Sequence, residues 1–384
     1  MLSSDNLINS QIRYNSSNPQ NLKPQGYSDY DILDFKIQAP GQCLVGGSVR
    51  LLFDVSVVGN TTLTTLCSYD GYSGGHAFIE SINTSTAAQG SIETIRFYQR
   101  QIACRARALL APEDLFNSHL VAEGRCNDEV ISDKLLKGFV PTGFADEAYD
   151  LEETTALDVC LRLDHCLNSF VGDNLLPLDR TGAITVSISL PRSASALFGN
   201  ADIGGTQTYV IKNPKLLYNT VADTGKNPKT HVMQVRSDFK QSINSSFVNI
   251  NSTVPLTANA FYLNFIEASK ENNNQYNSQQ CEVLPQVSRV SYIWNDSFSQ
   301  AITYELDNVV DYLSNYKRAV NSTNNGNSSL SLVANSANDC FGLGLQFGTY
   351  VDLRSQKLSI NIESAVQSGV PYTAYVHFTG ILSL

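Results

Sequence analysis

Positive charge is scarce in this sequence. Its 384 residues carry 36 acidic and 26 basic side chains, which gives a net charge of -10 at pH 7. Residues 1–30 contain only two cations, Arg13 and Lys23. Because affinity for nucleic acid comes largely from clustered Lys and Arg against phosphate, the composition argues against sequence-specific nucleic-acid binding and against an N-terminal polycation.

Signals for export and for membrane insertion are also missing. The sequence opens with Met1-Leu2-Ser3-Ser4-Asp5, and no apolar run approaches the roughly 20 residues that a membrane span needs. We therefore expect synthesis in a reducing cytosol, where thiols stay reduced. The cysteines include no CxxC pair and are expected to be buried thiols: Cys43, Cys67, Cys104, Cys126, Cys160, Cys166, Cys281 and Cys340.

A complete catalytic motif is lacking. Gly71-Tyr72-Ser73-Gly74-Gly75 fits the GxSxG pattern of a serine nucleophile, but that elbow joins a strand to a helix. The residues that follow, 76–82, alternate like a strand. We interpret the Gly-rich stretch as a turn between strands, and a serine hydrolase that uses Ser73 stays a remote alternative.

Metal-ligand spacing is absent as well. Neighbours on a strand point to opposite faces, so Asp164, His165 and Cys166 cannot form a relay on one strand. A zinc site would require distant segments to converge. We assign no catalytic, metal or cofactor-binding residue and expect a protein that is not an enzyme. The histidines show neither HxH nor HExxH spacing: His76, His119, His165, His231 and His377.

What the sequence does contain is a large apolar fraction in an uncharged polar background. Hydrophobic residues make up 42% and charged residues 16%, so sizeable cores can form with few ion pairs on the surface. Abundant Asn, Ser and Thr weaken helix interiors, whereas Val, Ile, Tyr and Phe suit strands. The length suits two domains of about 150–200 residues. These features predict a mainly β protein with two cores.

Alternating apolar residues predict the elements of the first half. Residues 1–30 lack any periodicity and are predicted to be an arm that becomes ordered only by packing on something else. From residue 33 the pattern of apolar residues has period two or, in places, helical spacing. It predicts strands at residues 33–37, 49–57, 76–82, 91–97, 156–163, 183–190 and 209–217, and helices at 98–110 and 128–137.

A second cycle follows a segment at residues 220–229 that is rich in turn residues and is the predicted linker. The cycle contains a helix with an apolar stripe between two groups of strands. Both halves therefore follow the order of four strands, a helical insertion and three strands. The predicted strands are 232–239, 247–254, 261–266, 287–294, 341–347, 358–362 and 372–378, and the stripe is Leu306, Val309, Val310, Leu313 and Val320.

The repeated order predicts a duplicated β-sandwich. It is clearest where residues 183–188 match residues 357–362 in their alternation. We expect an all-β fold of two tandem eight-stranded jelly-roll sandwiches with short helical insertions. The predicted divisions are an N-terminal arm at 1–30, a first jelly roll at 31–222 and a second at 223–384. Each jelly roll is expected to have its own core and the same strand order.

Several stretches carry a resemblance to a known family. Residues 74–82 and the passage Gly90-Ser91-Ile92-Glu93-Thr94-Ile95-Arg96-Phe97-Tyr98 are similar to a strand, a turn and a "G-x-I-E-x-I-x-x-Y" segment ahead of a helical insertion. Residues 175–178 with 209–214, and the closing 372–378, are similar to the ends of two barrels. In this pattern the chain resembles the double jelly-roll major capsid proteins of tailless double-stranded DNA viruses, including virophages and Polinton-like viruses.

The resemblance implies a structural protein of an icosahedral virion. It implies a homotrimer whose six barrels form an upright pseudo-hexagonal capsomer, with lattice contacts to neighbouring capsomers and partners among penton and minor capsid proteins. Genome packaging would then belong to another component, and the arm would run under the barrels. Synthesis would take place in the host cytosol or nucleus, and nothing follows about an internal membrane. The alternative from another class is a secreted or surface carbohydrate-binding adhesin, which should carry an export signal.

Overall fold

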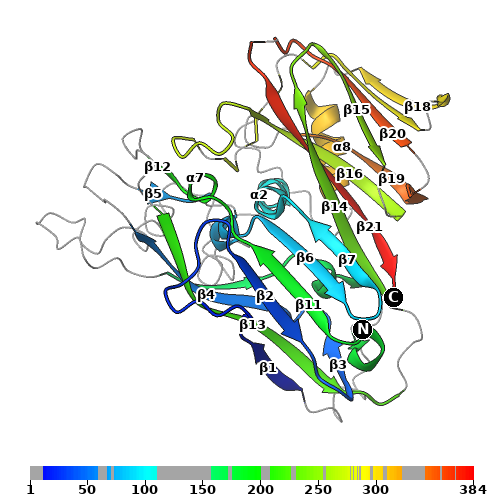
Figure 1. Ribbon diagram of the computed structural model, residues 1–384. Coiled ribbons are helices and arrows are strands. Elements are labelled where there is room, and N and C mark those ends of the chain that lie inside the picture. The colour runs from blue at the N-terminus through cyan, green and yellow to red at the C-terminus, as the bar shows by residue number, and fades with distance from the viewer. Residues whose placement is uncertain are drawn as a thin grey trace, which may run out of the picture.

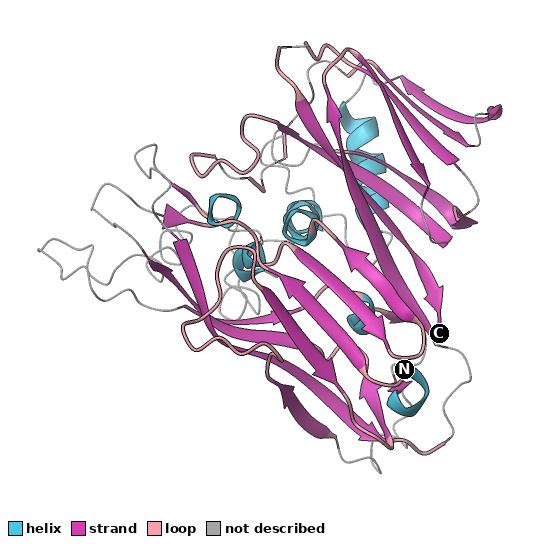
Figure 2. Cartoon of the chain, in the orientation of Figure 1, coloured by secondary structure: helices cyan, strands magenta, loops and turns pink. Residues whose placement is uncertain are grey.

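Two β-rich lobes lie side by side in the computed structural model (Figure 1), and strands dominate both of them (Figure 2). Within the described residues, no helix has both the length and the apolar character to cross a membrane. The structure describes residues 12–58, 67–70, 73–109, 157–171, 175–199, 208–225, 231–253, 257–276, 278–279, 281–282, 284, 287–294, 297–305, 309–321, 342–354, 357–367 and 369–384.

The first lobe is a sandwich of two four-stranded layers. One layer has the order β1-β13-β4-β8 and the other the order β2-β11-β6-β7. Short strands β3 (Gln42–Val45) and β10 (Leu175–Pro177) extend the first layer. The eight main strands are β1 (Arg13–Ser17), β2 (Ile32–Ile37), β4 (Arg50–Val58), β6 (Ser81–Thr86), β7 (Gly90–Ile95), β8 (Leu157–Arg162), β11 (Ile184–Ser189) and β13 (Thr208–Ala222).

The second lobe repeats this design with eight strands. Its layers have the orders β14-β21-β16-β19 and β15-β20-β17-β18. The strands are β14 (Val232–Ile243), β15 (Phe247–Thr253), β16 (Thr257–Glu267), β17 (Arg289–Trp294), β18 (Ser297–Glu305), β19 (Leu343–Asp352), β20 (Lys357–Glu363) and β21 (Tyr372–Ser383).

Both lobes share one topology. Numbered within its own lobe, each sandwich pairs its strands as first-eighth-third-sixth in one layer and second-seventh-fourth-fifth in the other. In both, a helix follows the fifth strand: α2 (Tyr98–Leu109) in the first lobe and α8 (Val309–Asn321) in the second. This is the Greek-key order of a jelly roll. The prediction of two tandem eight-stranded jelly rolls with matching strand order is confirmed.

Details of the predicted order were wrong. Five of the eight main strands, not four, precede the helix in each lobe. Residues 76–82 are not a strand, because a 3-10 helix, η1 (Gly74–Phe78), occupies this stretch and β6 begins only at Ser81. Gly74 opens η1 with a φ of 54°, which glycine adopts at no steric cost. The predicted helix at 128–137 and Leu306 of the helical stripe lie outside the described residues.

The N-terminal segment contributes to the fold. Residues 13–17 form β1, which pairs antiparallel with β13, so part of the predicted arm is the first strand of the first jelly roll. Residues 1–11 lie outside the described residues. β13 ends at Ala222 and β14 begins at Val232. The division of the chain into two independently folding units near residue 222 stays a prediction.

The cores of the two lobes are not separate, contrary to expectation. Within the first lobe, alternation buries Ile184, Val186 and Ile188 of β11 while their neighbours remain half-buried. However, most buried apolar side chains of the two lobes join into one continuous cluster. The reason is that β7 and β14 are adjacent strands of a single nine-stranded sheet that crosses from one lobe to the other.

Candidate functional site at the junction of the two lobes

Ser73 does not form a nucleophile site. Its side chain is buried, and its hydroxyl donates to the backbone carbonyl of Asp70 over 3.3 Å while its N–H donates to the Asp70 carboxylate over 3.0 Å. The nearby His76 points its Nδ1 at the Tyr98 hydroxyl, 3.0 Å away. A nucleophile must meet its substrate in a cleft. The arrangement therefore makes Ser73 part of a packed turn that leads into η1.

The contact between the lobes is built on three consecutive residues of β14. Ser237 pairs in parallel with Thr94 of β7. On either side of it, the Arg236 N–H donates to Glu93 Oε1 over 2.8 Å, and the Asp238 carboxylate accepts the N–H groups of Arg96 and Phe97 over 2.7 and 2.8 Å. Hydrogen bonds to charged groups are the stronger kind. The second lobe is thus joined to the first by a backbone pairing and by hydrogen bonds to two carboxylates.

The two carboxyl groups at this contact are deeply buried. Burial raises the pKa of Glu93, against the opposing effect of the Arg236 charge. Burial also raises the pKa of Asp238 to about 6, and the two N–H donors from Arg96 and Phe97 limit that rise. The cause in both cases is that a low-dielectric interior disfavours the charged form. Asp238 therefore titrates near the acid edge of the physiological range.

The guanidinium of Arg236 crosses from the second lobe into the first. Its Nη2 donates to Asp164 Oδ1 over 2.5 Å and its Nη1 to the Asp164 carbonyl over 3.1 Å. Arg105 of α2 forms an ion pair with the other carboxylate oxygen of Asp164. Glu93 Oε1 lies 4.0 Å from Nη1 of Arg236. Arg236 of the second lobe and Arg105 of the first thus lie beside two carboxyl groups of the first lobe, those of Glu93 and Asp164.

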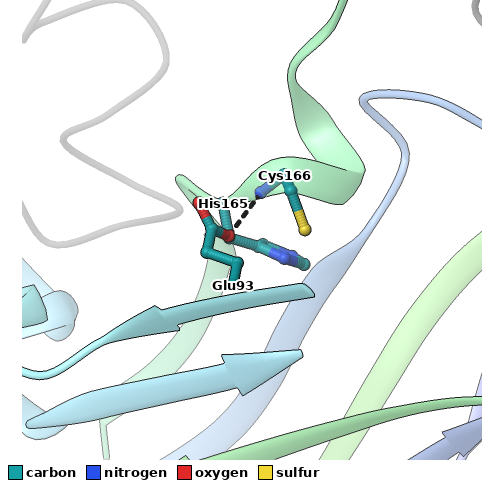
Figure 3. Close-up of side chains that lie close together, drawn as sticks. All are labelled: Glu93, His165 and Cys166. Atoms are coloured by element: carbon teal, nitrogen blue, oxygen red, sulfur yellow. Dashed lines mark hydrogen bonds between the residues drawn. The ribbon is translucent and has the colours of Figure 1, made fainter. Parts of the chain in front are cut away.

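Three possible metal ligands meet beside this network (Figure 3). The ligand atoms of Glu93, His165 and Cys166 all lie within 4.8 Å of one another, and all three residues are buried. His165 and Cys166 lie at the start of η3 (Cys166–Asn168), not on a strand as predicted. Within the described part of the chain, neither ring nitrogen of His165 has a hydrogen-bond partner. Distant segments therefore converge here as a zinc site would require.

The electrostatics of these three residues favour a structural role. Both carboxylate oxygens of Glu93 already accept N–H groups, from Cys166 over 2.7 Å and from Arg236 over 2.8 Å. Burial raises the pKa of the Cys166 thiol well above its usual value and lowers that of His165 to about 3. A cation would have to displace the thiol proton beside the positive Arg236. We assign this group to the polar junction rather than to a metal centre.

A second set of contacts lies along α2. Arg100 stacks its guanidinium over the ring of Tyr375 at 4.3 Å, and the ring of Phe97 meets the same ring edge-on at 5.0 Å. Arg100 also donates to the carbonyl of Ser278. Arginine on an aromatic face and edge-to-face rings are both favourable geometries. Helix α2 of the first lobe is thereby packed against β21 and the segment after β16 of the second.

A groove of about 880 Å³ follows the same junction. Residues of β7 and β14 form its floor, and Arg96, Arg354 and Asn251 are among the residues that line it. Both lobes contribute, so the groove exists only in the joined arrangement.

Two jelly rolls of identical strand order joined side by side define the double jelly-roll fold. Solved structures share it. The Faustovirus major capsid protein superposes with a TM-score of 0.60 at 11% identity, covering 98% of this chain and 90% of that one. The Sputnik virophage structure gives 0.60 at 12%, covering 97% and 86%. The mavirus major capsid protein gives 0.53 at 9%, covering 96% and 88%.

Comparisons by sequence alone give no match. No protein-family model matches the chain, and no curated protein matches it. With identities of this order, the structural likeness establishes the fold, and the resemblance first seen in strand patterns is confirmed at that level.

Sequence reasoning singled out Asp164, His165 and Cys166 but missed the residues of β7 and β14 that they contact at the junction. The segment containing Glu93 was singled out for its pattern, but not the carboxylate itself, and neither Arg236 nor Asp238 was noted. One signal was available. Arg236 and Asp238 are charged residues two apart in a predicted strand, and buried charges need partners. Their partners Glu93, Arg96 and Phe97 lie more than 140 residues earlier in the chain, and Asp164 lies 72 residues earlier, so no local pattern reveals these contacts.

Proposed function

We propose that this chain is a viral major capsid protein, a structural subunit that assembles into trimeric pseudo-hexagonal capsomers of an icosahedral shell. The observation that carries the proposal is the matched strand order of two joined jelly rolls over nearly the whole chain, shared with the Faustovirus and mavirus major capsid proteins. Duplication lets three chains fill a six-sided lattice position. The chain would then reside in the virion, with penton and minor capsid proteins as further partners.

The alternatives receive less support. The burial of Ser73 in a hydrogen-bonded turn removes the basis of the serine hydrolase. The structural neighbours named above are capsid proteins, and none of them favours a carbohydrate-binding adhesin. A structural role without catalysis is what we propose.

The contact between the lobes suggests how copies meet. Within the chain, the fifth strand of the first lobe, β7, lies beside the first strand of the second, β14. Repeating this contact around a ring places the fifth strand of the second lobe, β18, beside β1 of the next copy. Among the described residues, β1 and β18 are both edge strands, and they lie at opposite ends of the molecule (Figure 1). Head-to-tail contacts of this kind form a ring when the rotation between copies closes.

Exposed apolar side chains support β1 as a contact surface. Of the nine large apolar side chains that are exposed in the described residues, five lie within residues 12–32. Tyr14 on β1 is 83% exposed and Leu22 is 72% exposed. Apolar surface gathered in this way is typical of an interaction site. We infer that this segment packs on a neighbouring subunit.

Light scattering coupled to size exclusion tests the proposal on the full chain. We expect a species near three times 42.0 kDa. Tyr14→Asp places a charge on the proposed contact and should shift the population to monomer. Its matched control is Tyr276→Asp, which changes another exposed tyrosine, 45% accessible, in the loop after β16, and it should leave the trimer intact. A parent chain that stays monomeric at all concentrations would contradict the assembly, and equal behaviour of both variants would contradict the contact.

A further inference from the structure

Two buried cysteines meet where the lobes join. Cys104 lies on α2 of the first lobe and Cys281 in the segment between β16 and β17 of the second, 177 positions apart in sequence. Their sulfur atoms are 3.1 Å apart, and each residue is 1% exposed. A disulfide bond is about 2.05 Å long. A movement of about 1 Å would therefore bring the sulfurs to bonding distance.

The surroundings of the two sulfurs are apolar and tightly packed. They belong to a small hydrophobic cluster, separate from the main core, that joins α2, α8 and β16. The other members are Ala260, Tyr262, Tyr316, Ala319 and Val320. A disulfide is itself apolar, so it would be accommodated here without an unsatisfied polar group.

The segment that carries Cys281 is already held in place. The carbonyl of Ser278 accepts from Arg100 of α2, the Gln279 side chain donates to the carbonyl of Ser195 over 3.1 Å, and the Glu282 N–H donates to the carbonyl of Phe265 over 2.8 Å. Two of these contacts reach the first lobe. Because backbone on both sides of Cys281 is fixed, little further ordering is needed to hold its sulfur against Cys104.

We propose that Cys104 and Cys281 form a disulfide that covalently fastens the first lobe to the second, with a low-molecular-weight disulfide such as oxidised glutathione as the oxidant. The thiolate of one cysteine attacks the small disulfide, forms a mixed disulfide and releases one small thiolate. The thiolate of the other cysteine attacks the protein sulfur of that mixed disulfide and releases the second. The two cysteines are oxidised, the small disulfide is reduced to two thiols, and these take up the two protons that the cysteines lose.

Burial of the two sulfurs determines when the disulfide can form. Neither sulfur is accessible in the closed structure, so oxidation requires the lobes to part locally or takes place during folding. After it forms, the same burial shields the bond from reducing thiols. Its placement in time rests on the proposed function: a capsid subunit made in a reducing cell and released into an oxidising medium would acquire the bond after synthesis.

Peptide mapping of the purified full chain under non-reducing conditions tests the site. The chain is incubated with oxidised glutathione, with and without mild urea, digested and analysed by mass spectrometry. We expect a Cys104–Cys281 linked peptide that forms faster in urea and disappears in Cys104→Ser and in Cys281→Ser. Cys43→Ser, which changes another buried cysteine, is the matched control and should retain the link. A chain that refolds from urea in oxidised glutathione without this link, or with another pairing, overturns the proposal.

Thermal unfolding supplies a second readout. A bond that closes a loop of this length restricts the unfolded chain strongly, and we expect oxidation to raise the unfolding temperature by on the order of 5 °C. Cys104→Ser should show no such rise, and Cys43→Ser should show it in full. An unfolding temperature that oxidation leaves unchanged would mean that the bond does not fasten the lobes. Both measurements are made on the isolated chain, so a failure to form trimers would not affect them.

Discussion

The first and second lobes share one strand order and differ in what covers their edges. In the first lobe, the outer edge of the fifth strand, β7, is occupied by β14. In the second, the equivalent strand β18 lies at the edge of its sheet within the described residues. The first lobe also carries accessory strands, among them β3 and β10, whereas the described residues of the second lobe form only the eight strands of the basic design. The two lobes therefore share one topology and differ at their edges.

The covered edge is also where buried charge gathers. Glu93, Arg236 and Asp238 are buried at the β7–β14 contact, and Asp164 beside them is 23% exposed. The ion pair between Arg289 and Glu363 in the second lobe is by contrast nearly half exposed on both sides. Buried charges persist only when they are paired and hydrogen-bonded. Polar groups therefore determine which strands meet at the junction, and the apolar core beneath them stabilises it.

The largest effect should come from truncating the core of either lobe. Phe35 in β2 and Phe378 in β21 are both fully buried in the continuous cluster. Replacing either by Ala should cost about 4 kcal/mol of unfolding free energy, because transfer energy is lost and a cavity remains. If the cores act as one, both variants shift a single transition in urea denaturation and calorimetry. Two transitions, each moved by only one variant, would show that the lobes unfold separately.

Removing the carboxylate of Glu93 should have the next largest effect. Glu93→Ala leaves the N–H groups of Cys166 and Arg236 without their acceptor and removes a partner of the Arg236 charge. We expect a loss of about 3 kcal/mol in urea denaturation. Glu363→Ala, at the exposed pair of the second lobe, should cost less than about 1 kcal/mol. Equal costs at both sites would remove the distinction between the junction and the exposed surface.

The two buried histidines and Asp238 should affect the pH dependence of stability in opposite directions. Burial lowers the pKa of His165 and of His377 to about 3. A histidine whose folded-state pKa is lowered contributes stability at pH values above its unfolded-state pKa, which is near 6.5. This stability is lost as the pH falls. Asp238, whose pKa is raised to about 6, acts in the opposite sense, because its contribution is present at low pH and is lost as the pH rises through 6.

Glu93, whose pKa is also raised by burial, acts in the same sense as Asp238. Each buried histidine by itself should cost stability as the pH falls from 7 to 4.5. His377→Gln should reduce that loss by roughly 2 kcal/mol, because one buried proton acceptor is gone. The ring stacks on Tyr262 at 4.9 Å, and its Nδ1 lies 3.9 Å from Asp238, so the comparison is made between slopes against pH rather than between absolute stabilities. Urea denaturation at several pH values measures it. Parallel slopes for the variant and the parent would refute the assignment.

The smallest effects should come from substituting glycines around which each lobe is tightly packed. A Cβ on Gly75 would lie 2.4 Å from Cγ1 of Val159, and one on Gly342 would lie 2.3 Å from Cε2 of Tyr316 and 2.8 Å from the carbonyl of Leu263. Substitution by Ala should cost about 1–3 kcal/mol by overpacking, more at Gly342 because backbone cannot move aside. Gly369, with no atom within 4 Å, is the control and should be unaffected in thermal unfolding.

Strands with regular alternation could be read directly from the sequence. β2, β4, β11 and β14 all lie where period-two patterns predicted them. β18 was missed because Gln300 interrupts the alternation of Phe298, Ile302 and Tyr304. β1 was missed because Tyr14 is its one large apolar residue. The stretch at residues 76–82 was wrongly predicted to be a strand, because its short apolar pattern does not reveal that η1 occupies Gly74–Phe78.

The site was harder to predict than the fold. Cysteines were expected to be buried. Cys43, Cys104, Cys166 and Cys281 are buried, whereas Cys160 is only half-buried, contrary to that expectation. Their spacing did not indicate which of them would meet. The contact between Cys104 and Cys281 depends on α2 packing against α8 across two lobes, and the Glu93–Arg236 contact depends on one parallel pairing. Both are tertiary consequences that no local period encodes.

The open edge of β18 has a consequence for a chain that has not yet assembled. An edge strand presents unpaired N–H and C=O groups that invite pairing with other chains, and soluble proteins normally blunt such edges. If copies close on one another through this edge, the same groups make the lone chain prone to aggregate. Yield in recombinant expression should then rise when synthesis is slow relative to oligomerisation, because fewer unpaired β18 edges are present at one time.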